Sequence, residues 1–120
     1  MLPSPRRPQY STIHYQSEHK MSAPSTTLIL VHGAFHCPAH YAALLAAIAA
    51  LLPTLTIVAL ALPTVGRTQS HAMRTRHDDV AAVASAVTAA ADRGDDVVVL
   101  MHSYGGVSLS SLLTSSLSIP

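Results

Sequence analysis

Three short apolar runs that alternate with helical segments constrain the fold of this chain more than any other feature. The runs cover residues 26–31, 55–62 and 96–102 and are rich in Val, Ile, Leu and Thr. Between them, residues 39–52 and 78–93 have the composition and spacing of helices. Strands that alternate with helices form parallel sheets with right-handed crossovers. The sequence therefore predicts an α/β fold, a three-layer αβα arrangement around a short, mostly parallel sheet.

Residues 99–107, Val-Leu-Met-His-Ser-Tyr-Gly-Gly-Val, contain the side chain best suited to chemistry. A β-branched run enters a turn centred on Ser103, and a helix is expected from residue 104. Gly105 and Gly106 are small enough for a tight turn that projects the hydroxyl and leaves backbone N–H groups facing a developing oxyanion. The usual Gly-x-Ser-x-Gly pattern has glycine where this chain has Met101. A strand, turn and glycine-rich helix start without chemistry is the alternative interpretation.

A second loop is expected at the same edge of the sheet. The apolar run 26–31 reads as a buried parallel strand, and the pattern breaks at Gly33. Acyl transfer needs two N–H donors that converge on the oxyanion, one after the nucleophile and one from such a loop. We predict an oxyanion hole formed by the amides of Tyr104 and Ala34, with Phe35 as an alternative to Ala34.

Four segments together resemble one known family. They are His-Gly-Ala-Phe-His at 32–36, Leu-Pro-Thr-Val-Gly at 62–66, Asp-Val-Ala-Ala-Val at 79–83 and Met-His-Ser-Tyr-Gly-Gly at 101–106. In this order they resemble the α/β-hydrolase superfamily (AB hydrolase-1 type), and within it the branch of small esterases, plant-type methylesterases and hydroxynitrile lyases. The resemblance covers residues 26 to 107, and none is seen beyond.

The resemblance implies a serine hydrolase core that acts on a small-molecule ester without a cofactor. It makes Ser103 the catalytic nucleophile. The residues that it implies around the elbow and the pocket are His32, Gly33, His36, His102, Gly105 and Gly106.

The expected catalytic acid and base are missing after the nucleophile. In the family the acid and then the histidine follow the serine along the chain, but residues 104–120 contain no Asp, Glu or His. A chain of 120 residues is also much shorter than a complete hydrolase of this type. We therefore expect the N-terminal half of the fold, truncated and inactive or nearly inactive alone.

Several upstream residues are expected at the same edge of the sheet as Ser103. His32 and His36 follow the first strand, and Asp78 and Asp79 open a helix. The ordinary interpretation is that the aspartates cap the helix or favour its first turn, and that the histidines fix their loop by hydrogen bonds. The side chain of His102 is expected on the strand face opposite Ser103.

Other features indicate no metal and no disulfide. Cys37 is the only cysteine, so it cannot form an intramolecular disulfide, and we expect an inert thiol and a cytoplasmic location. Histidines at positions 32, 36 and 40 recur every four residues, which on a helix would suggest a metal-binding face, but a glycine and a proline interrupt any such helix.

The two ends of the chain differ from its centre. Residues 1–24 contain four prolines among polar residues and are expected to be disordered, with no apolar segment that would make a secretory signal. The core is expected at 25–107. Residues 108–120 form a Ser/Leu-rich tail of uncertain structure. Leucines at 109, 112, 113 and 117 could share one helix face, or the tail could come from a truncated or mis-spliced reading frame.

Composition limits the partners. A net charge of +1 gives no basic surface for nucleic acid. Residues 41–62 lack charge over a length that could span a bilayer, but Pro53 and the change from Ala/Leu to β-branched residues favour helix, turn and strand. Only 11% of residues are charged and mean hydropathy is +0.35. The apolar strand at 97–100 is expected at a sheet edge, where it invites self-association or aggregation.

Three functions remain open. The first is ester hydrolysis by Ser103 with a histidine base. The second is a hydroxynitrile-lyase-like C–C bond cleavage, which also needs a basic histidine. The third is a non-catalytic or defective fragment that only binds or associates, and the short length favours it.

Overall fold

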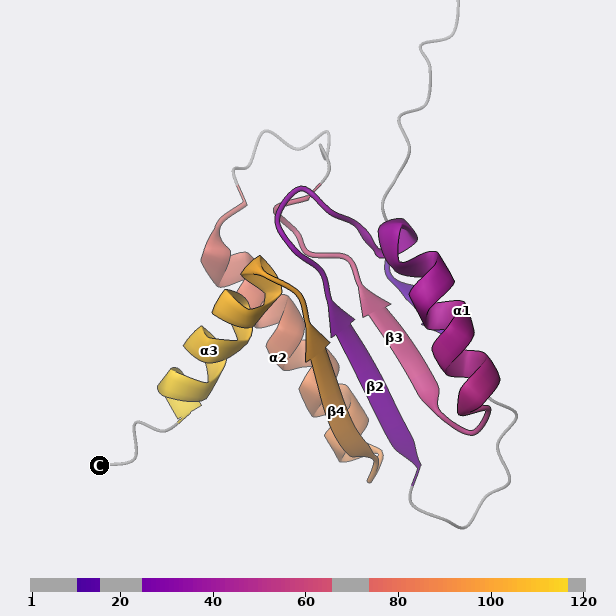
Figure 1. Ribbon diagram of the computed structural model, residues 1–120. Coiled ribbons are helices and arrows are strands. Elements are labelled where there is room, and N and C mark those ends of the chain that lie inside the picture. The colour runs from indigo at the N-terminus through magenta and orange to yellow at the C-terminus, as the bar shows by residue number, and fades with distance from the viewer. Residues whose placement is uncertain (1–10, 16–24, 66–73, 117–120) are drawn as a thin grey trace, which may run out of the picture.

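A four-stranded sheet forms the centre of the molecule in the computed structural model, which describes residues 11–15, 25–65 and 74–116. The strand order is β1-β3-β2-β4 (Figure 1). The strands are β1 Ile13–Tyr15, β2 Thr26–Val31, β3 Thr56–Leu60 and β4 Asp96–Met101. Strand β2 pairs in parallel with both β3 and β4. The predicted α/β fold is confirmed, with the first predicted strand between the other two.

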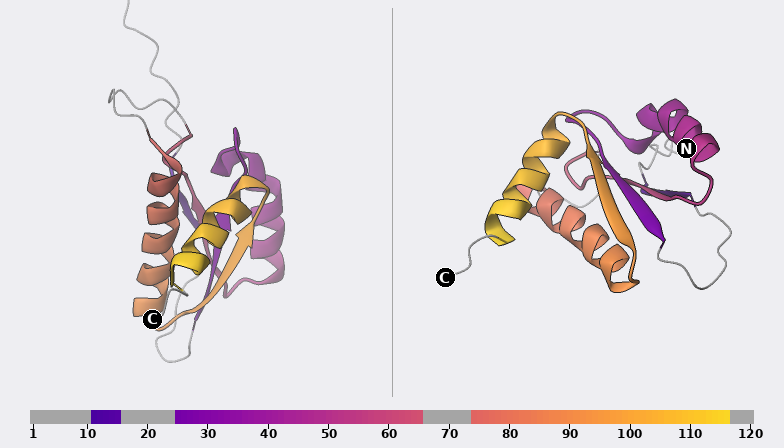
Figure 2. Two further views of the ribbon diagram at one scale, coloured as in Figure 1. Left: turned by 90° about the vertical axis from the view of Figure 1, so that its left-hand side faces the viewer. Right: turned by 60° about the horizontal axis from the view of Figure 1, so that its bottom comes forward.

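Helices cover both faces of the sheet, as Figures 1 and 2 show. They are α1 Ala42–Leu51 after a short 3-10 turn, η1 Pro38–Tyr41, then α2 Arg76–Asp92 and α3 Tyr104–Ser116. Alternate strand residues point to opposite faces. Leu28, Leu30 and Ile57 therefore pack with Leu45 of α1, whereas Ile29 packs on the α2 and α3 side.

The uncharged stretch 41–62 folds as the sequence predicts. It ends the 3-10 turn, forms α1 and then, after a turn, enters β3. Within the described part of the chain, no helix is long and apolar enough to cross a membrane.

Strand β1 corrects the expectation that residues 1–24 are disordered throughout. Residues 13–15 pair antiparallel with β3, and the Ala61 N–H donates to Thr12 Oγ1 over 3.0 Å. The side chain of Ile13 packs against the apolar cluster on the α1 side. The reason is that the outer edge of β3 offers unpaired N–H and C=O groups, which an extended segment with an apolar residue can satisfy. Residues 1–10 and 16–24 lie outside the described ranges.

The Ser/Leu-rich segment continues a helix. Helix α3 runs without a break from residue 104 through residue 116. Leu109 and Leu112 pack against the cluster on the α2 side, whereas Leu113 is 54% exposed. The predicted leucine face is therefore only partly correct, because residue 113 is rotated by about 100° from residue 112 around the helix axis. Position 117 lies outside the described residues.

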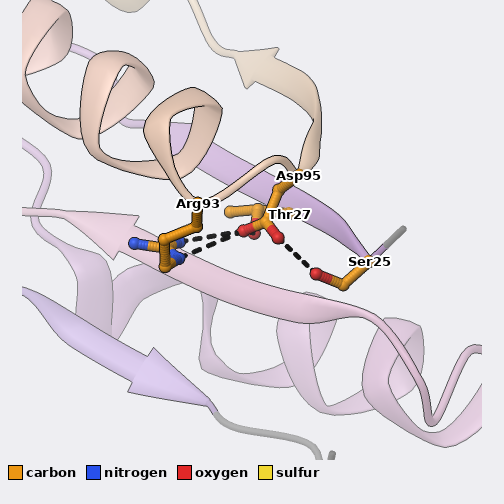
Figure 3. A network of polar contacts seen from close by, with 4 residues as sticks. All are labelled: Ser25, Thr27, Arg93 and Asp95. Atoms are coloured by element: carbon orange, nitrogen blue, oxygen red, sulfur yellow. Dashed lines mark hydrogen bonds and ion pairs between the residues drawn. The ribbon is translucent and has the colours of Figure 1, made fainter. Parts of the chain in front are cut away.

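A polar network fixes the amino end of the sheet, where β2 and β4 begin (Figure 3). Asp95, in the turn between α2 and β4, accepts hydrogen bonds from Ser25 Oγ, from Thr27 Oγ1 at 2.8 Å and from Arg93. The two hydroxyl donors, followed by Arg93, hold the pKa of Asp95 below its ordinary value. The network therefore contributes its full stabilisation above the ordinary carboxyl pKa. This contribution is lost as the pH falls through the lowered pKa of Asp95.

Candidate active site

Ser103 lies in the predicted turn between β4 and α3. Its φ is +52°, which places a non-glycine residue in the left-handed region. The Gly105 N–H donates to the His102 carbonyl and the Gly106 N–H to the Ser103 carbonyl, each over 2.9 Å. The serine is exposed. The predicted turn is therefore present, and its positive φ makes Ser103 a strained residue, whereas the catalytic role of Ser103 stays a prediction.

The residues around the elbow explain its sequence. A Cβ atom at Gly105 would lie 2.3 Å from the carbonyl oxygen of Val31, so only glycine lets α3 begin against the end of β2. Met101, which replaces the glycine of the usual pattern, does not block the turn. Its side chain is 41% exposed and lies beside Gly106, whose Cβ would be 3.6 Å from Met101 Cγ.

The predicted second loop lies next to this elbow. The His36 N–H donates to the Gly33 carbonyl over 3.2 Å, which closes a turn with Phe35 at its third position. Phe35 has a φ of +62° and is 98% exposed, so packing does not compensate for its strain. A Cβ at Gly33 would lie 3.1 Å from Nδ1 of His102. The two loops therefore share the carboxyl edge of the sheet, as predicted.

A pocket of about 520 Å³ opens between the loops. It has the size of a small-molecule site. Its wall includes Ala34 and Phe35 from one loop and Tyr104, the residue after Ser103, from the other. The remaining lining residues are His36, Cys37, His40, Thr64 and Val65. All three residues predicted for the oxyanion hole therefore border one cavity.

Tyr41 joins the two loops, and sequence analysis did not single it out. Its Oη accepts the Gly33 N–H over 3.1 Å and is 2.7 Å from Nδ1 of His102. Because the phenol oxygen accepts from Gly33, its own proton is available for the ring nitrogen of His102. The imidazole of His36 packs edge-on against that of His102, with ring centroids 5.4 Å apart. The only feature of the sequence that could have indicated this role of Tyr41 is an aromatic residue placed soon after the loop that follows the first strand.

His32 holds the loop after β2 in place from inside the protein and is not among the residues that line the pocket. Its side chain is fully buried. Nδ1 is 2.8 Å from the Gly33 carbonyl, and Nε2 accepts the Leu62 N–H over 3.0 Å. These contacts require the neutral tautomer that carries its proton on Nδ1. Burial lowers the pKa of His32 below its ordinary value of 6.5. The predicted loop-fixing role is confirmed.

Asp79 links the loop after β3 to the start of α3. It lies in the first turn of α2 and is fully buried. Its Oδ1 accepts the Thr64 N–H over 3.0 Å, and its Oδ2 accepts the hydroxyls of Thr64 at 2.7 Å and of Tyr104 at 2.8 Å. Burial, followed by the bond to Asp79, raises the pKa of Tyr104. Asp79 thus positions the residue whose amide is the predicted oxyanion donor.

Asp78 and Asp79 have different roles, which the sequence analysis did not distinguish. Thr75 is the N-cap of α2, and its N–H donates to Asp78 Oδ2 over 2.7 Å in a capping box. The ordinary interpretation therefore holds for Asp78. Asp79 does more than favour the first turn, because it faces inward, where it meets Thr64 and Tyr104.

Comparison with known families agrees with this arrangement. The sequence profile of the alpha/beta hydrolase family matches residues 28–118, most of the chain. This chain belongs to the alpha/beta hydrolase family. The match includes residues 108–118, so the expectation that the family pattern ends near residue 107 is wrong. A search of curated proteins gives no significant match.

In this alpha/beta hydrolase the described histidines make no hydrogen bond to the serine. Their hydrogen bonds go elsewhere: His36 Nδ1 to the Ala34 carbonyl, His40 Nδ1 to the Cys37 N–H, and His102 to Tyr41. Within residues 11–15, 25–65 and 74–116, no hydrogen bond joins a histidine to Ser103 Oγ. Over the same ranges, no group of three His, Cys, Asp or Glu side chains is placed to hold a metal ion.

The burial of His32 predicts a pH dependence of folding. Because its folded-state pKa is below 6.5, the unfolded chain binds the proton more readily, and the contribution of His32 is complete above the ordinary pKa. It is lost as the pH falls from about 6.5 toward the lowered value. Urea unfolding at pH 7.5 and pH 5.5 should show this loss for the native chain.

A His32→Gln variant should be less stable at pH 7.5 and lose less stability between the two pH values. His77→Gln is the matched control, since His77 is exposed in the first turn of α2, and it should keep the native pH dependence. Equal pH dependence in the native chain and His32→Gln would contradict the assignment.

Proposed function

We propose that this chain is a serine hydrolase core that reacts with carboxylic esters through Ser103. The observation that carries the proposal is the pairing of two strained residues. Phe35 and Ser103 are the non-glycine residues with positive φ in the described part of the chain. They belong to the two loops that border one pocket, at the carboxyl edge of the sheet. Strained backbone that packing does not explain is typical of active sites.

The proposed chemistry uses the oxygen of Ser103 as the nucleophile. Attack on an ester carbonyl forms a tetrahedral adduct, whose collapse releases the alcohol and leaves an acyl-enzyme that water converts to the acid. The amide of Tyr104 stands at the start of α3, where it has no intrahelical acceptor. Together with the amide of Ala34 or Phe35, it is the proposed donor to the oxyanion. The pocket between these residues is the proposed acyl or alcohol site.

The proposed chemistry requires a base that removes the proton of the serine hydroxyl. A serine is a poor nucleophile unless a base removes that proton, and the histidine contacts described above do not place one on Ser103. This observation favours a second candidate: a core that binds esters but does not turn them over. We therefore expect the isolated chain to hydrolyse activated esters very weakly or not at all, with a residual acceleration of about a thousandfold or somewhat more over the uncatalysed rate.

Two measurements on one set of variants test the proposal. The chain is incubated with a fluorophosphonate label and, separately, with p-nitrophenyl acetate. Slow labelling should reach one site, disappear in Ser103→Ala and persist in Ser110→Ala, which removes another exposed hydroxyl on α3. Labelling that is unchanged in Ser103→Ala would contradict the assignment of Ser103. Fast ester turnover that vanishes in Ser103→Ala would instead reveal a base, and His36→Gln would be the next variant.

A further inference from the structure

The hydroxyl of Tyr41 is bonded to both loops of the candidate site. Its oxygen accepts the Gly33 N–H over 3.1 Å and lies 2.7 Å from Nδ1 of His102, the residue before Ser103. The ring of Tyr41 packs against the apolar cluster on the α1 side, and this packing limits the movement of the phenol. The hydroxyl therefore ties the loop after β2 to the residue that precedes Ser103.

The proton positions in this bridge follow from the groups that it joins. The backbone N–H of Gly33 can only donate, so the phenol oxygen of Tyr41 accepts from it. The proton of the phenol is then directed to Nδ1 of His102, which must lack a proton in order to accept it. Each group therefore has a partner of the right kind, and the hydroxyl is held in one orientation.

The carbonyl group of Gly33 is fixed as well. It accepts the Nδ1 proton of His32 over 2.8 Å and the N–H of His36 over 3.2 Å. This carbonyl and the N–H of Ala34 belong to one planar peptide unit, in which the two groups point in opposite directions. The Ala34 N–H therefore points away from the buried side chain of His32, and the bonds of Gly33 set its direction.

We propose that Tyr41 is a positioning residue for the amide of Ala34 in the proposed oxyanion hole. This role rests on the proposed function, because an oxyanion forms only if Ser103 attacks a carbonyl group. Tyr41 is not among the residues that line the pocket, so it acts through its bond to Gly33. That bond keeps the peptide between Gly33 and Ala34 in place before the oxyanion develops. Donors that are already in place need no reorganisation at the moment of reaction.

The variant Ser103→Cys measures the oxyanion hole without a general base, because a thiol with a pKa of about 8.5 is largely ionised near that pH. p-Nitrophenyl acetate transfers its acetyl group to this sulfur and releases p-nitrophenolate, through an adduct with a negative oxygen. Iodoacetamide alkylates the same sulfur and releases iodide, and no oxyanion forms. The ratio of the acylation rate to the alkylation rate therefore reports the oxyanion hole, since thiol exposure and ionisation affect both reactions alike.

Adding Tyr41→Phe to Ser103→Cys should lower this ratio about tenfold, because a displaced donor loses part of the roughly hundredfold or larger effect of an oxyanion-hole donor. The rate of alkylation should not change. Thr27→Val is the matched control. It also removes one hydroxyl bond, the 2.8 Å contact with Asp95 at the amino end of the sheet, and it should leave the ratio unchanged. Peptide mass spectrometry separates modification at position 103 from modification of the buried Cys37.

Failure of the proposed function and failure of this inference give different results. A ratio in Ser103→Cys that is no higher than that of glutathione would contradict the proposed function, and the role of Tyr41 would fall with it. A high ratio that Tyr41→Phe leaves unchanged would overturn the positioning role alone.

Amide hydrogen exchange followed by NMR tests the bridge itself. In the native chain the Gly33 amide should be protected, and in Tyr41→Phe it should exchange at least about tenfold faster. The amide of Leu30, in the central strand β2, should stay protected in both proteins, which shows that the variant is folded. Unprotected Gly33 in the native chain would overturn the positioning role whether or not Tyr41→Phe folds. Equal protection of Gly33 in both proteins would overturn it too.

Discussion

Replacing Gly105 with alanine is expected to destabilise this protein by about 3 kcal/mol or more. The added Cβ would lie 2.3 Å from the Val31 carbonyl oxygen and 3.1 Å from that of His32. Both neighbours are backbone atoms at the end of a central strand, so they cannot move aside as a side chain could. The start of α3 would have to shift away from the sheet, and the amide of Tyr104 would move with it.

Gly106→Ala provides the matched control in the same turn of helix. A Cβ there meets only Met101 Cγ at 3.6 Å and Sδ at 3.7 Å, which is ordinary contact with a flexible side chain. Because alanine favours helix over glycine by up to about 1 kcal/mol, this variant should be neutral or slightly more stable. Urea unfolding monitored by circular dichroism measures both. A Gly105→Ala midpoint at or above that of Gly106→Ala would contradict the close approach of α3 to β2.

Removing the carboxylate of Asp79 is the second change with a large expected effect. In Asp79→Ala the Thr64 N–H and the hydroxyls of Thr64 and Tyr104 lose the acceptor that they share. Bonds to a charged group contribute more than neutral ones, and buried donors without a partner are costly. We expect a loss of about 3–5 kcal/mol, a large fraction of the stability of a small domain.

The neighbouring residue is a control of the same chemistry. Asp78→Ala removes only the capping-box contact with Thr75, so it should cost about 1 kcal/mol. A spectrophotometric titration separates the specific role of Asp79 from general destabilisation. The bond to Asp79 helps to raise the pKa of Tyr104, so Asp79→Asn, which removes the charge, should lower that pKa while the chain is folded. Equal stability losses at 78 and 79, with an unchanged tyrosine titration, would contradict the assignment.

Gly105 and Asp79 also affect the proposed activity. Gly105 lets α3 begin beside β2, and Asp79 holds the phenol of Tyr104 at the same helix start. Neither touches the proposed substrate position, so both are positioning residues for the amide of Tyr104. In a folded variant with a displaced α3, fluorophosphonate labelling of Ser103 should slow even though the serine itself is unchanged.

The sequence by itself determined the secondary structure of the core and the elbow. The positions of β2, β4 and α3 follow from local features: β-branched runs, small residues at 105 and 106, and helical spacing. A strained turn at Ser103 also follows from its neighbours, because the backbone dihedrals of a tight turn depend mainly on the residues within it. The resemblance to the alpha/beta hydrolase family likewise depended on short segments in a fixed order, and the family profile over residues 28–118 confirmed it.

Only the tertiary structure decided the contacts between segments that are distant along the chain. Asp78 and Asp79 are the same residue type at adjacent positions, yet one caps a helix and the other is buried, because about 100° of rotation around α2 separates their side chains. Tyr41 meets His102 across 61 positions, and Ile13 pairs with β3 only because that edge is open. Local propensity carries no information on such pairs, since each partner is selected by where the folded chain places the other.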